Sequence, residues 1–411
     1  MKKTRTTIQT SPHTHWCTRL GKNLLLSILS ICLFLAGMEL VARIWYSPQK
    51  LSDASIFEYD SEKLFRLKSN LTTTFKEVPF TTNAFGYRDN AVPMAKPKDA
   101  KRVLLVGDSI AFGFRVLDSE TFDTYLEQSL NNLFDERGEN TTVEVINTAA
   151  PGNSPFQEYH DLKRGLAFEP DVVLLQLTLN DIIEERGFWI FEEMGIAGKQ
   201  GSNSAMENAD YIFGTANFPH IDTVLRQRSA LYCMLKDWGS RIRFRDPGGE
   251  RIAEKAQNEE IFSVLSLVYT PNHPTVLASW QRALGWIQKI TETAERENVP
   301  LIILLTPYNF QFPLSKETAV PQQTLSVFAQ NREIPFVDLL AILQEQFASN
   351  LIGENPDGRN TDEIIAESIG KQPERWRDFW NTFFLDYDHP SPAGNRFIAD
   401  ILLPIVAHTL E

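Results

Sequence analysis

Cysteine is scarce in this chain, with three residues among 411. Cys17 precedes the one long apolar segment, Cys32 lies inside it, and only Cys233 remains in the body of the chain. A single cysteine excludes a disulfide within the folded body. The pattern His13-Thr14-His15 lies in a basic N-terminal tail, and no stretch has the ligand spacing of a zinc site. We therefore expect no metal and no other cofactor.

Basic residues are few outside the N-terminus. Through residue 44 the chain has six basic residues and one acidic residue, whereas the remainder has 34 basic and 52 acidic residues, a net charge of −18. Nucleic-acid binding depends on Lys and Arg contacts to phosphates, so an acidic body argues against a nucleic acid as partner. A glycine-rich loop of either common phosphate-binding pattern is also absent.

Only one apolar run is long enough to cross a membrane. It extends from Leu24 to Ala42 with Glu39 as its one charged residue, and about 20 residues span a bilayer core. Trp45 and Tyr46 follow it, where an aromatic belt would lie. Basic residues precede the run, and these favour a cytoplasmic N-terminus with the body outside.

We therefore predict a cytoplasmic basic tail at residues 1–22 and a single-pass transmembrane signal-anchor at residues 23–46. The alternative is a cleaved signal peptide, whose cleavage site needs small residues. Leu35 opposes cleavage after Gly37, and Leu40 opposes cleavage after Ala42.

Residues 47–99 form a lead-in segment and linker before the main domain. Asn83 and Gly86 carry turn chemistry, and a proline-containing stretch at residues 93–97 follows them. The stretch from Thr82 to Arg88 resembles a segment found in membrane-anchored bacterial enzymes of the family named below. We expect it to pack on the main domain as a strand and turn.

The rest of the chain is organised around residues 101–114, KRVLLVGDSIAFGF. The apolar run Val103–Val106 predicts a buried strand that breaks at Gly107 and Asp108. Ser109 then stands at the carboxyl end of that strand, before a helix. Ligands bind at this edge in open α/β sheets, so the hydroxyl of Ser109 is placed to meet a substrate.

A second stretch with candidate catalytic residues lies near the C-terminus. Ser391 and Pro392 predict the start of a helix, as cap and first helical residue. Asp386 and His389 lie on the loop just before it. A neutral imidazole can activate a serine, and a carboxylate can fix the imidazole tautomer. Asp388 is adjacent, and we expect its side chain to point elsewhere.

Two further blocks follow predicted strands. Asn147–Ser154 contains Gly152, and Leu177–Asp181 contains Asn180. Together the four blocks resemble the SGNH (GDSL-type) hydrolase family over roughly residues 100–411. The resemblance implies an oxyanion hole made by the backbone N–H of Ser109, the N–H of Gly152 and the side-chain amide of Asn180. The family usually has glycine where this chain has Thr178, so the shape of the pocket there is expected to differ.

Five apolar runs alternate with helical patterns, which predicts an α/β fold. We expect a three-layer α/β/α sandwich with a mostly parallel five-stranded sheet, and the family resemblance implies a flavodoxin-like strand order. The regular alternation of predicted strands and helices stops at about residues 182–275. We interpret that segment as an insertion in the domain at residues 100–411, either a lid over the active-site edge or a subdomain that only packs.

The leading functional hypothesis is a serine esterase with Ser109, His389 and Asp386 as its triad, acting outside the cytoplasm. The expected substrate is an ester-bearing small molecule, a lipid or an O-acylated cell-envelope glycan. One alternative is an O-acyltransferase that modifies exported polysaccharide. The other is a catalytically silent binding module on the same fold.

Overall fold

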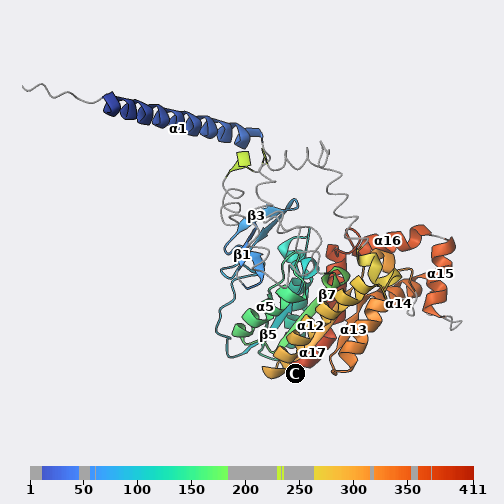
Figure 1. Ribbon diagram of the computed structural model, residues 1–411. Helices are drawn as coiled ribbons and strands as arrows, with labels where there is room; N and C mark the ends of the chain where they lie inside the picture. Colours follow the sequence, from blue (N-terminus) through green and yellow to red (C-terminus); the bar gives the residue numbers. More distant parts are fainter. Residues whose placement is uncertain are drawn as a thin grey trace, which may run out of the picture.

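The computed structural model describes residues 12–45, 56–60, 62–183, 229–232, 234–235, 263–314, 319–352, 360–371 and 373–411. Most of the predicted insertion at residues 182–275 lies outside the described residues, as do Cys233 and the tail before residue 12. The described body is a layered α/β structure, from which one long helix projects (Figure 1).

A five-stranded sheet forms the centre of the body. Its strands are β5 (Ala100–Val106), β6 (Thr142–Asn147), β7 (Val172–Thr178), β8 (Leu301–Thr306) and β9 (Phe336–Asp338). They lie in the order β6-β5-β7-β8-β9, and every neighbouring pair is parallel. This is the flavodoxin-like order, so the predicted α/β fold and strand order are confirmed.

The apolar strands are buried on both faces because helices cover both. Along β5, Val103 and Leu105 point into one hydrophobic core, whereas Leu104 and Val106 point into the other. This alternation follows from the pleat of a strand. The first core is covered by α4 (Phe122–Glu136), α14 (Leu339–Ile352) and α17 (Pro392–Leu410). The second core is covered by α5 (Pro155–Gly165), α12 (Pro274–Arg296) and α13 (Val320–Gln330).

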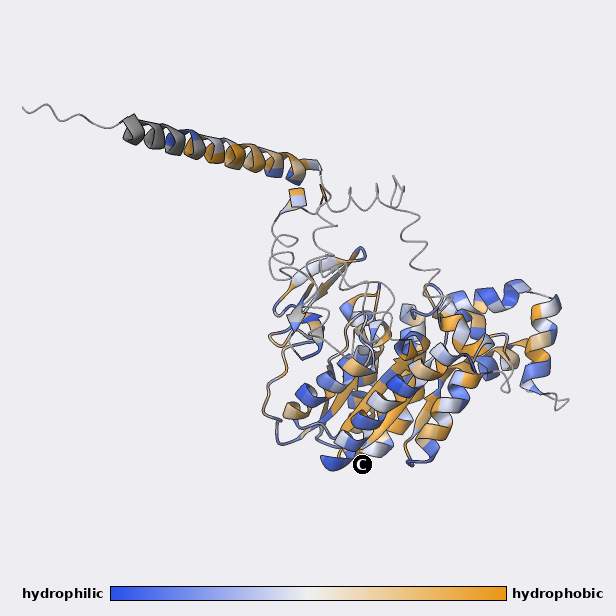
Figure 2. Cartoon of the chain, in the orientation of Figure 1, coloured by the Kyte–Doolittle hydropathy of each residue, from blue (hydrophilic) through white to orange (hydrophobic). Residues whose placement is uncertain are grey.

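Two further helices, α15 (Thr361–Lys371) and α16 (Pro373–Phe383), pack beside α14 and α17. Figure 2 shows the hydrophobic strands enclosed between helices whose outer faces are largely hydrophilic. The three-layer arrangement brings the carboxyl ends of β5, β6 and β7 together at one edge of the sheet.

The lead-in segment forms two antiparallel hairpins. They are β1 (Phe57–Asp60) with β2 (Leu64–Leu67), and β3 (Thr72–Phe75) with β4 (Val78–Thr81). Phe57, Phe75 and Phe80 are buried in the same core as α4 and α17. The lead-in therefore packs on the domain and contributes aromatic side chains to the domain core. The strand expected within residues 82–88 is absent, because β4 ends at Thr81 and residues 82–88 form a turn.

Arg88 connects the lead-in to the segment that follows Ser109. Its guanidinium donates to the carbonyl oxygens of Phe112 (3.0 Å), Gly113 (2.6 Å) and Val116 (2.6 Å), and it pairs with Asp118 at 2.7 Å. The side chain of Arg88 is 3% exposed. A buried carbonyl that loses its donor costs about 1–3 kcal/mol, so this residue stabilises the turn after Ser109.

We expect Arg88→Ala to lower the free energy of unfolding by about 3 kcal/mol, because several buried carbonyl groups lose their donor together. Urea unfolding of the full chain in detergent micelles measures this change. Arg137→Ala is the matched control, since Arg137 is exposed and pairs with Glu411 at the surface. Equal shifts in the two variants would show that Arg88 has no special structural role.

The helix α1 (Pro12–Trp45) contains the predicted anchor. Its segment Leu25–Trp45 has a mean hydropathy of 2.3 and is 6% buried, so it is long and apolar enough to cross a membrane. Glu39 accepts hydrogen bonds from the hydroxyl of Ser229 (2.6 Å) and the backbone N–H of Ala230 (3.0 Å). The one carboxylate inside the apolar run is therefore paired.

Candidate active site

The carboxyl end of β5 positions Ser109. Asp108 caps the four-residue helix α3 (Ser109–Phe112), because its Oδ1 accepts from the N–H of Ile110 at 2.9 Å. Ser109 therefore begins a helix directly after a buried strand, and it is 3% exposed. Its hydroxyl lies at the edge where neighbouring strands end.

The loop between α16 and α17 positions His389. The N–H of Leu385 donates to the carbonyl of His389 at 2.8 Å, which closes a tight loop. Ser391 caps α17 by accepting from the N–H of Gly394 at 3.1 Å, as the sequence predicted. The imidazole stacks on Phe114, with ring centroids 4.3 Å apart. The ring is thus held between the loop and the segment after Ser109.

The structure brings Ser109, His389 and Asp386 together. Nε2 of His389 lies 3.0 Å from Oγ of Ser109, and Nδ1 lies 3.0 and 3.1 Å from the two carboxylate oxygens of Asp386. Oδ1 of Asp386 also accepts from the backbone N–H of His389 at 2.9 Å. This is the hydrogen-bonded order hydroxyl, imidazole, carboxylate that activates a serine.

The charges within this group shift the pKa values of Asp386 and His389. Burial alone would raise the pKa of Asp386, but hydrogen bonds from His389 lower it to about 2. Burial alone would lower the pKa of His389, but the charges and hydrogen bonds of Asp388 and Asp386 raise it to about 10. The carboxylate of Asp386 is therefore ionised, and the imidazole of His389 favours its charged form.

Asp388 corrects one expectation from the sequence. Its side chain does not point elsewhere but is fully buried, with Oδ1 2.9 Å from Nδ1 of His389. Asp386, Asp388 and His389 are the one group of described residues whose ligand atoms lie close enough together to hold an ion. Their contacts have hydrogen-bond lengths, and Nε2 already faces Ser109. We assign this group to charge pairing with the imidazole rather than to a metal.

Gly152 and Asn180 follow the strands on either side of β5. Gly152 has a φ of +80°, which favours glycine, and the next residue, Asn153, donates from Nδ2 to the carbonyl of Gly107 at 3.0 Å. Asn180 lies in α6 (Leu179–Ile182), and its Nδ2 lies 2.6 Å from the hydroxyl of Tyr308. Asn153 therefore connects the loop of Gly152 to the strand end that carries Ser109, whereas Asn180 contacts Tyr308, which follows β8.

Thr178, which stands where the family usually has glycine, lies at the end of β7. Its hydroxyl donates to the carbonyl of Thr306 on β8 at 3.3 Å, and its N–H donates to Oδ2 of Asp181 at 2.6 Å. The side chain therefore bonds to the neighbouring strand. Asp181 accepts this bond and Asp108 caps α3, so each carboxylate shapes the loop of its own motif.

Sequence analysis missed Gln176, which lies inside β7 and is fully buried. Its Oε1 accepts from the N–H groups of Asp108 (3.3 Å) and Ala111 (3.2 Å), so β7 braces the turn that holds Ser109. A Cβ on Gly107 would lie only 2.6 Å from that same oxygen, so a residue with a side chain would clash there. The sequence feature that could have identified Gln176 is a single glutamine within an otherwise apolar strand pattern.

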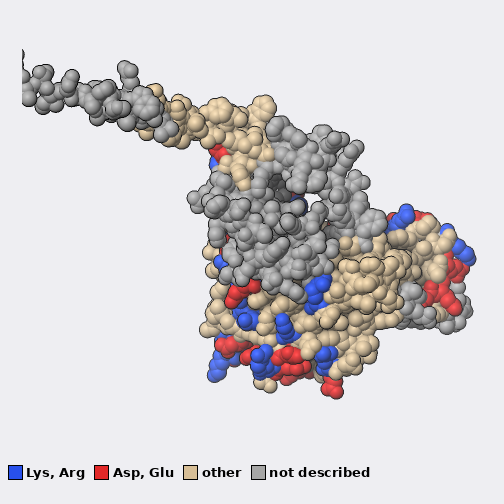
Figure 3. Space-filling view, in the orientation of Figure 1, with Lys and Arg blue, Asp and Glu red and all other residues tan. Residues whose placement is uncertain are grey.

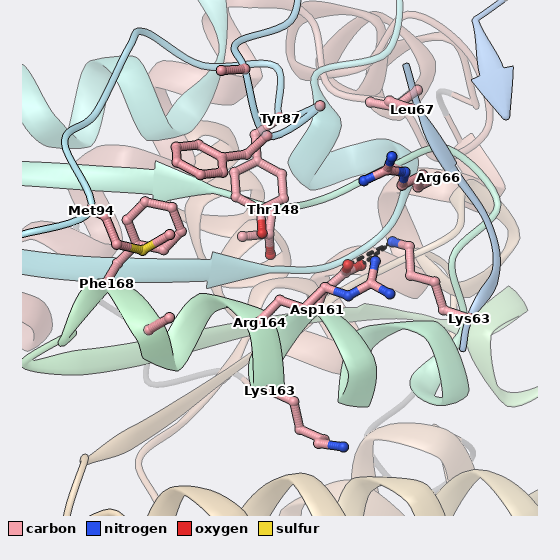
Figure 4. Close-up of a pocket in the computed structure, with 15 residues that line it drawn as sticks. Lys63, Arg66, Leu67, Tyr87, Met94, Thr148, Asp161, Lys163, Arg164 and Phe168 are labelled. Carbon is pink, nitrogen blue, oxygen red and sulfur yellow. Dashed lines mark hydrogen bonds and ion pairs between the residues drawn. The ribbon is translucent and has the colours of Figure 1, made fainter. Parts of the chain in front are cut away.

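A separate cavity of about 410 Å³ lies between the lead-in and α5, and neither Ser109 nor His389 lines it. Figure 4 shows Lys63 reaching from the lead-in to Asp161 on α5, and Nζ lies 2.6 Å from each of its carboxylate oxygens. Arg164, also on the cavity wall, pairs with Asp60 at 2.8 Å. The charged side chains of Lys63, Asp161 and Arg164 on the cavity wall are therefore paired within the chain.

The described surface shows no single-signed patch on the face in Figure 3. Lys and Arg side chains alternate there with Asp and Glu, whereas the part of the projecting helix that is not grey is mostly tan.

No protein-family model matches the chain, and no curated protein matches it. Similar solved structures include a member of the lipolytic protein G-D-S-L family from Veillonella parvula, with 13% identity, coverage of 74% of this chain and 97% of that chain, and a TM-score of 0.34. A catalytic mutant of an acetylxylan esterase from Geobacillus stearothermophilus has 13% identity, coverage of 75% and 94%, and a TM-score of 0.33. A psychrotrophic esterase from Pseudoalteromonas sp. has 9% identity, coverage of 68% and 99%, and a TM-score of 0.28.

Proposed function

We propose that this chain is an SGNH-type ester hydrolase, with Ser109 as nucleophile, His389 as general base and Asp386 as the residue that orients the base. The observation that carries this proposal is the contact of 3.0 Å between Oγ of Ser109 and Nε2 of His389, with Asp386 on the opposite ring nitrogen. The two residues are 280 positions apart in the chain, so no local feature accounts for their meeting.

In the proposed mechanism, Oγ of Ser109 attacks the ester carbonyl while Nε2 of His389 takes the hydroxyl proton. The tetrahedral intermediate collapses, and His389 gives that proton to the leaving alcohol. Water then attacks the acyl-serine, with His389 as base, and releases the carboxylic acid and free Ser109. Asp386 stabilises the imidazolium that forms in both halves of the reaction.

The oxyanion that forms in each half needs hydrogen-bond donors. We assign this role to the backbone N–H groups of Ser109 and Gly152 and to the side-chain amide of Asn180. Donors placed in advance are stronger toward the oxyanion than toward the ground-state carbonyl, because charge develops only in the transition state. The positions of all three at the ends of adjacent strands support this assignment.

The proposed substrate is an ester on a lipid or on an O-acylated glycan outside the cytoplasm. The experiment that tests the reaction incubates the full chain in detergent micelles with p-nitrophenyl esters of graded acyl length and with acetylated glycans. Release of acid supports hydrolysis, and acyl transfer to an added acceptor alcohol without acid release would favour the O-acyltransferase. No turnover and no labelling by a fluorophosphonate would favour the silent binding module.

We also propose that α1 spans the membrane once, with the body outside the cytoplasm. The apolar segment Leu25–Trp45 and the basic residues before it support this topology. A reporter that is active only after export, fused after residue 411, should be active. The chain should also remain with the membrane fraction after an alkaline carbonate wash. A mature N-terminus near residues 37–43 would show a cleaved signal peptide instead.

A further inference from the structure

Two carboxylates face the same nitrogen of His389. Oδ1 of Asp388 lies 2.9 Å from Nδ1, and the oxygens of Asp386 lie 3.0 and 3.1 Å from it. Asp388 is fully buried and His389 is 5% exposed, so bulk water screens these contacts poorly. An imidazole that is oriented by one carboxylate does not require the second.

The two carboxylates have different geometry. Asp386 hydrogen-bonds to the ring nitrogen and also accepts from the backbone N–H groups of Asp388 and His389, at 3.1 and 2.9 Å. Nδ1 carries one hydrogen, and the contact with Asp386 fixes its direction. The contact with Asp388 is therefore mainly one of charge. Two buried carboxylates this close together repel each other unless a positive charge lies between them.

Two further charged side chains of the described residues, Arg115 and Asp108, lie near this group. Arg115, from the segment after α3, lies 3.8 Å from Oδ2 of Asp386 and is half exposed. Asp108 precedes Ser109 and lies 3.4 Å from its hydroxyl. Phe114 and Tyr387 contribute rings rather than charges. The imidazolium of His389 is thus the buried cation that offsets Asp386 and Asp388.

We propose that Asp388 is a positioning residue that holds His389 as the imidazolium in the free enzyme, and so sets the pH at which Ser109 is activated. This inference rests on the proposed function, because it concerns the base of that reaction. The raised pKa of His389, about 10, agrees with it, and among the groups that raise this pKa Asp388 contributes most.

The direction of the pH effect follows from the chemistry. His389 can accept a proton only when it is neutral, so kcat/KM falls about tenfold for each pH unit below the pKa of His389. A raised pKa therefore places the acid limb of the profile on the alkaline side of neutrality. Removing the charge of Asp388 lowers that pKa, which increases the neutral fraction at pH 7 and weakens the base.

The test measures kcat/KM from pH 5.5 to 9.5 for the full chain and for Asp388→Asn, corrected for uncatalysed ester hydrolysis. We expect the unmodified chain to gain activity up to the end of this range. In Asp388→Asn the midpoint of the acid limb should fall by about one to three pH units, the effect of removing one close opposite charge. The variant should then be about tenfold more active at pH 7 and less active at its maximum.

Two further variants make the result specific. Asp388→Glu restores the charge and should move the acid limb back toward higher pH. Asp400→Asn is the matched control, since Asp400 is exposed on α17 and should leave the profile unchanged. If Asp388→Asn is active and its kcat/KM rises over the same pH range as that of the unmodified chain, the inference is wrong.

The inference remains testable if Asp388→Asn does not fold. The rate at which a fluorophosphonate labels Ser109 in the unmodified chain reports the protonation of His389, and it should also rise above pH 8. A labelling midpoint near 6.5, the ordinary pKa of histidine, would overturn the role of Asp388 while leaving the proposed hydrolase intact. Absence of labelling at every pH would instead overturn the proposed function.

Discussion

Ser109→Ala is expected to lower kcat by about 10⁴-fold or more and to abolish labelling by a fluorophosphonate. The methyl group cannot form an acyl-enzyme, so His389 loses the hydroxyl that lies 3.0 Å from its Nε2. Some rate above that in water should persist, because oxyanion donors and substrate binding remain. Initial rates on a p-nitrophenyl ester and gel-based detection of the probe measure the two effects.

The matched control for this prediction is Ser119→Ala. Ser119 is an exposed serine ten positions further along the chain, so its loss should change neither activity nor labelling. Circular dichroism should show that both variants fold like the unmodified chain. A Ser109→Ala protein that keeps most of its esterase activity would remove Ser109 from the mechanism.

Asn180→Ala is expected to lower kcat by roughly 10²–10³-fold with little change in KM. An amide that donates to the oxyanion stabilises the transition state more than the bound ester, and such differential binding changes kcat. The contact of 2.6 Å with the hydroxyl of Tyr308 orients this amide. Full Michaelis–Menten profiles at one pH separate kcat from KM.

Two comparisons sharpen this result. Asn331→Ala removes an exposed amide at the end of α13 and should have no effect on either constant. Tyr308→Phe keeps the Asn180 amide but removes the hydroxyl beside it, so we expect a smaller loss of kcat. If Asn180→Ala instead raises KM and leaves kcat intact, Asn180 binds the ground state, and the oxyanion hole consists of backbone groups alone.

The central sheet could be predicted from the sequence because its strands are short apolar runs that end in turn chemistry. Val103–Val106 and Leu301–Leu305 are buried on both faces, and a continuous apolar run is the pattern such strands require. The predicted start of α17 also holds, since proline and a capping serine act locally. These features depend on neighbouring residues, which a sequence displays directly.

The supporting contacts of the site could not be predicted in this way. Arg88 and Gln176 act on the loop around Ser109 from 24 or more positions away, so only the fold brings them there. The direction of the Asp388 side chain could not be predicted, because side chains alternate regularly in a strand but not in a tight loop. The tight loop closed between Leu385 and His389 turns the side chain of Asp388 inward instead.

The separation of Ser109 from His389 has a consequence for biosynthesis. The 280 intervening positions take roughly 15 to 55 seconds to translate at about 5–20 residues per second. Throughout that interval the proposed nucleophile has been made but its proposed base has not. In the proposed mechanism, the reactive pair first exists when the loop that carries His389 packs on the segment after Ser109.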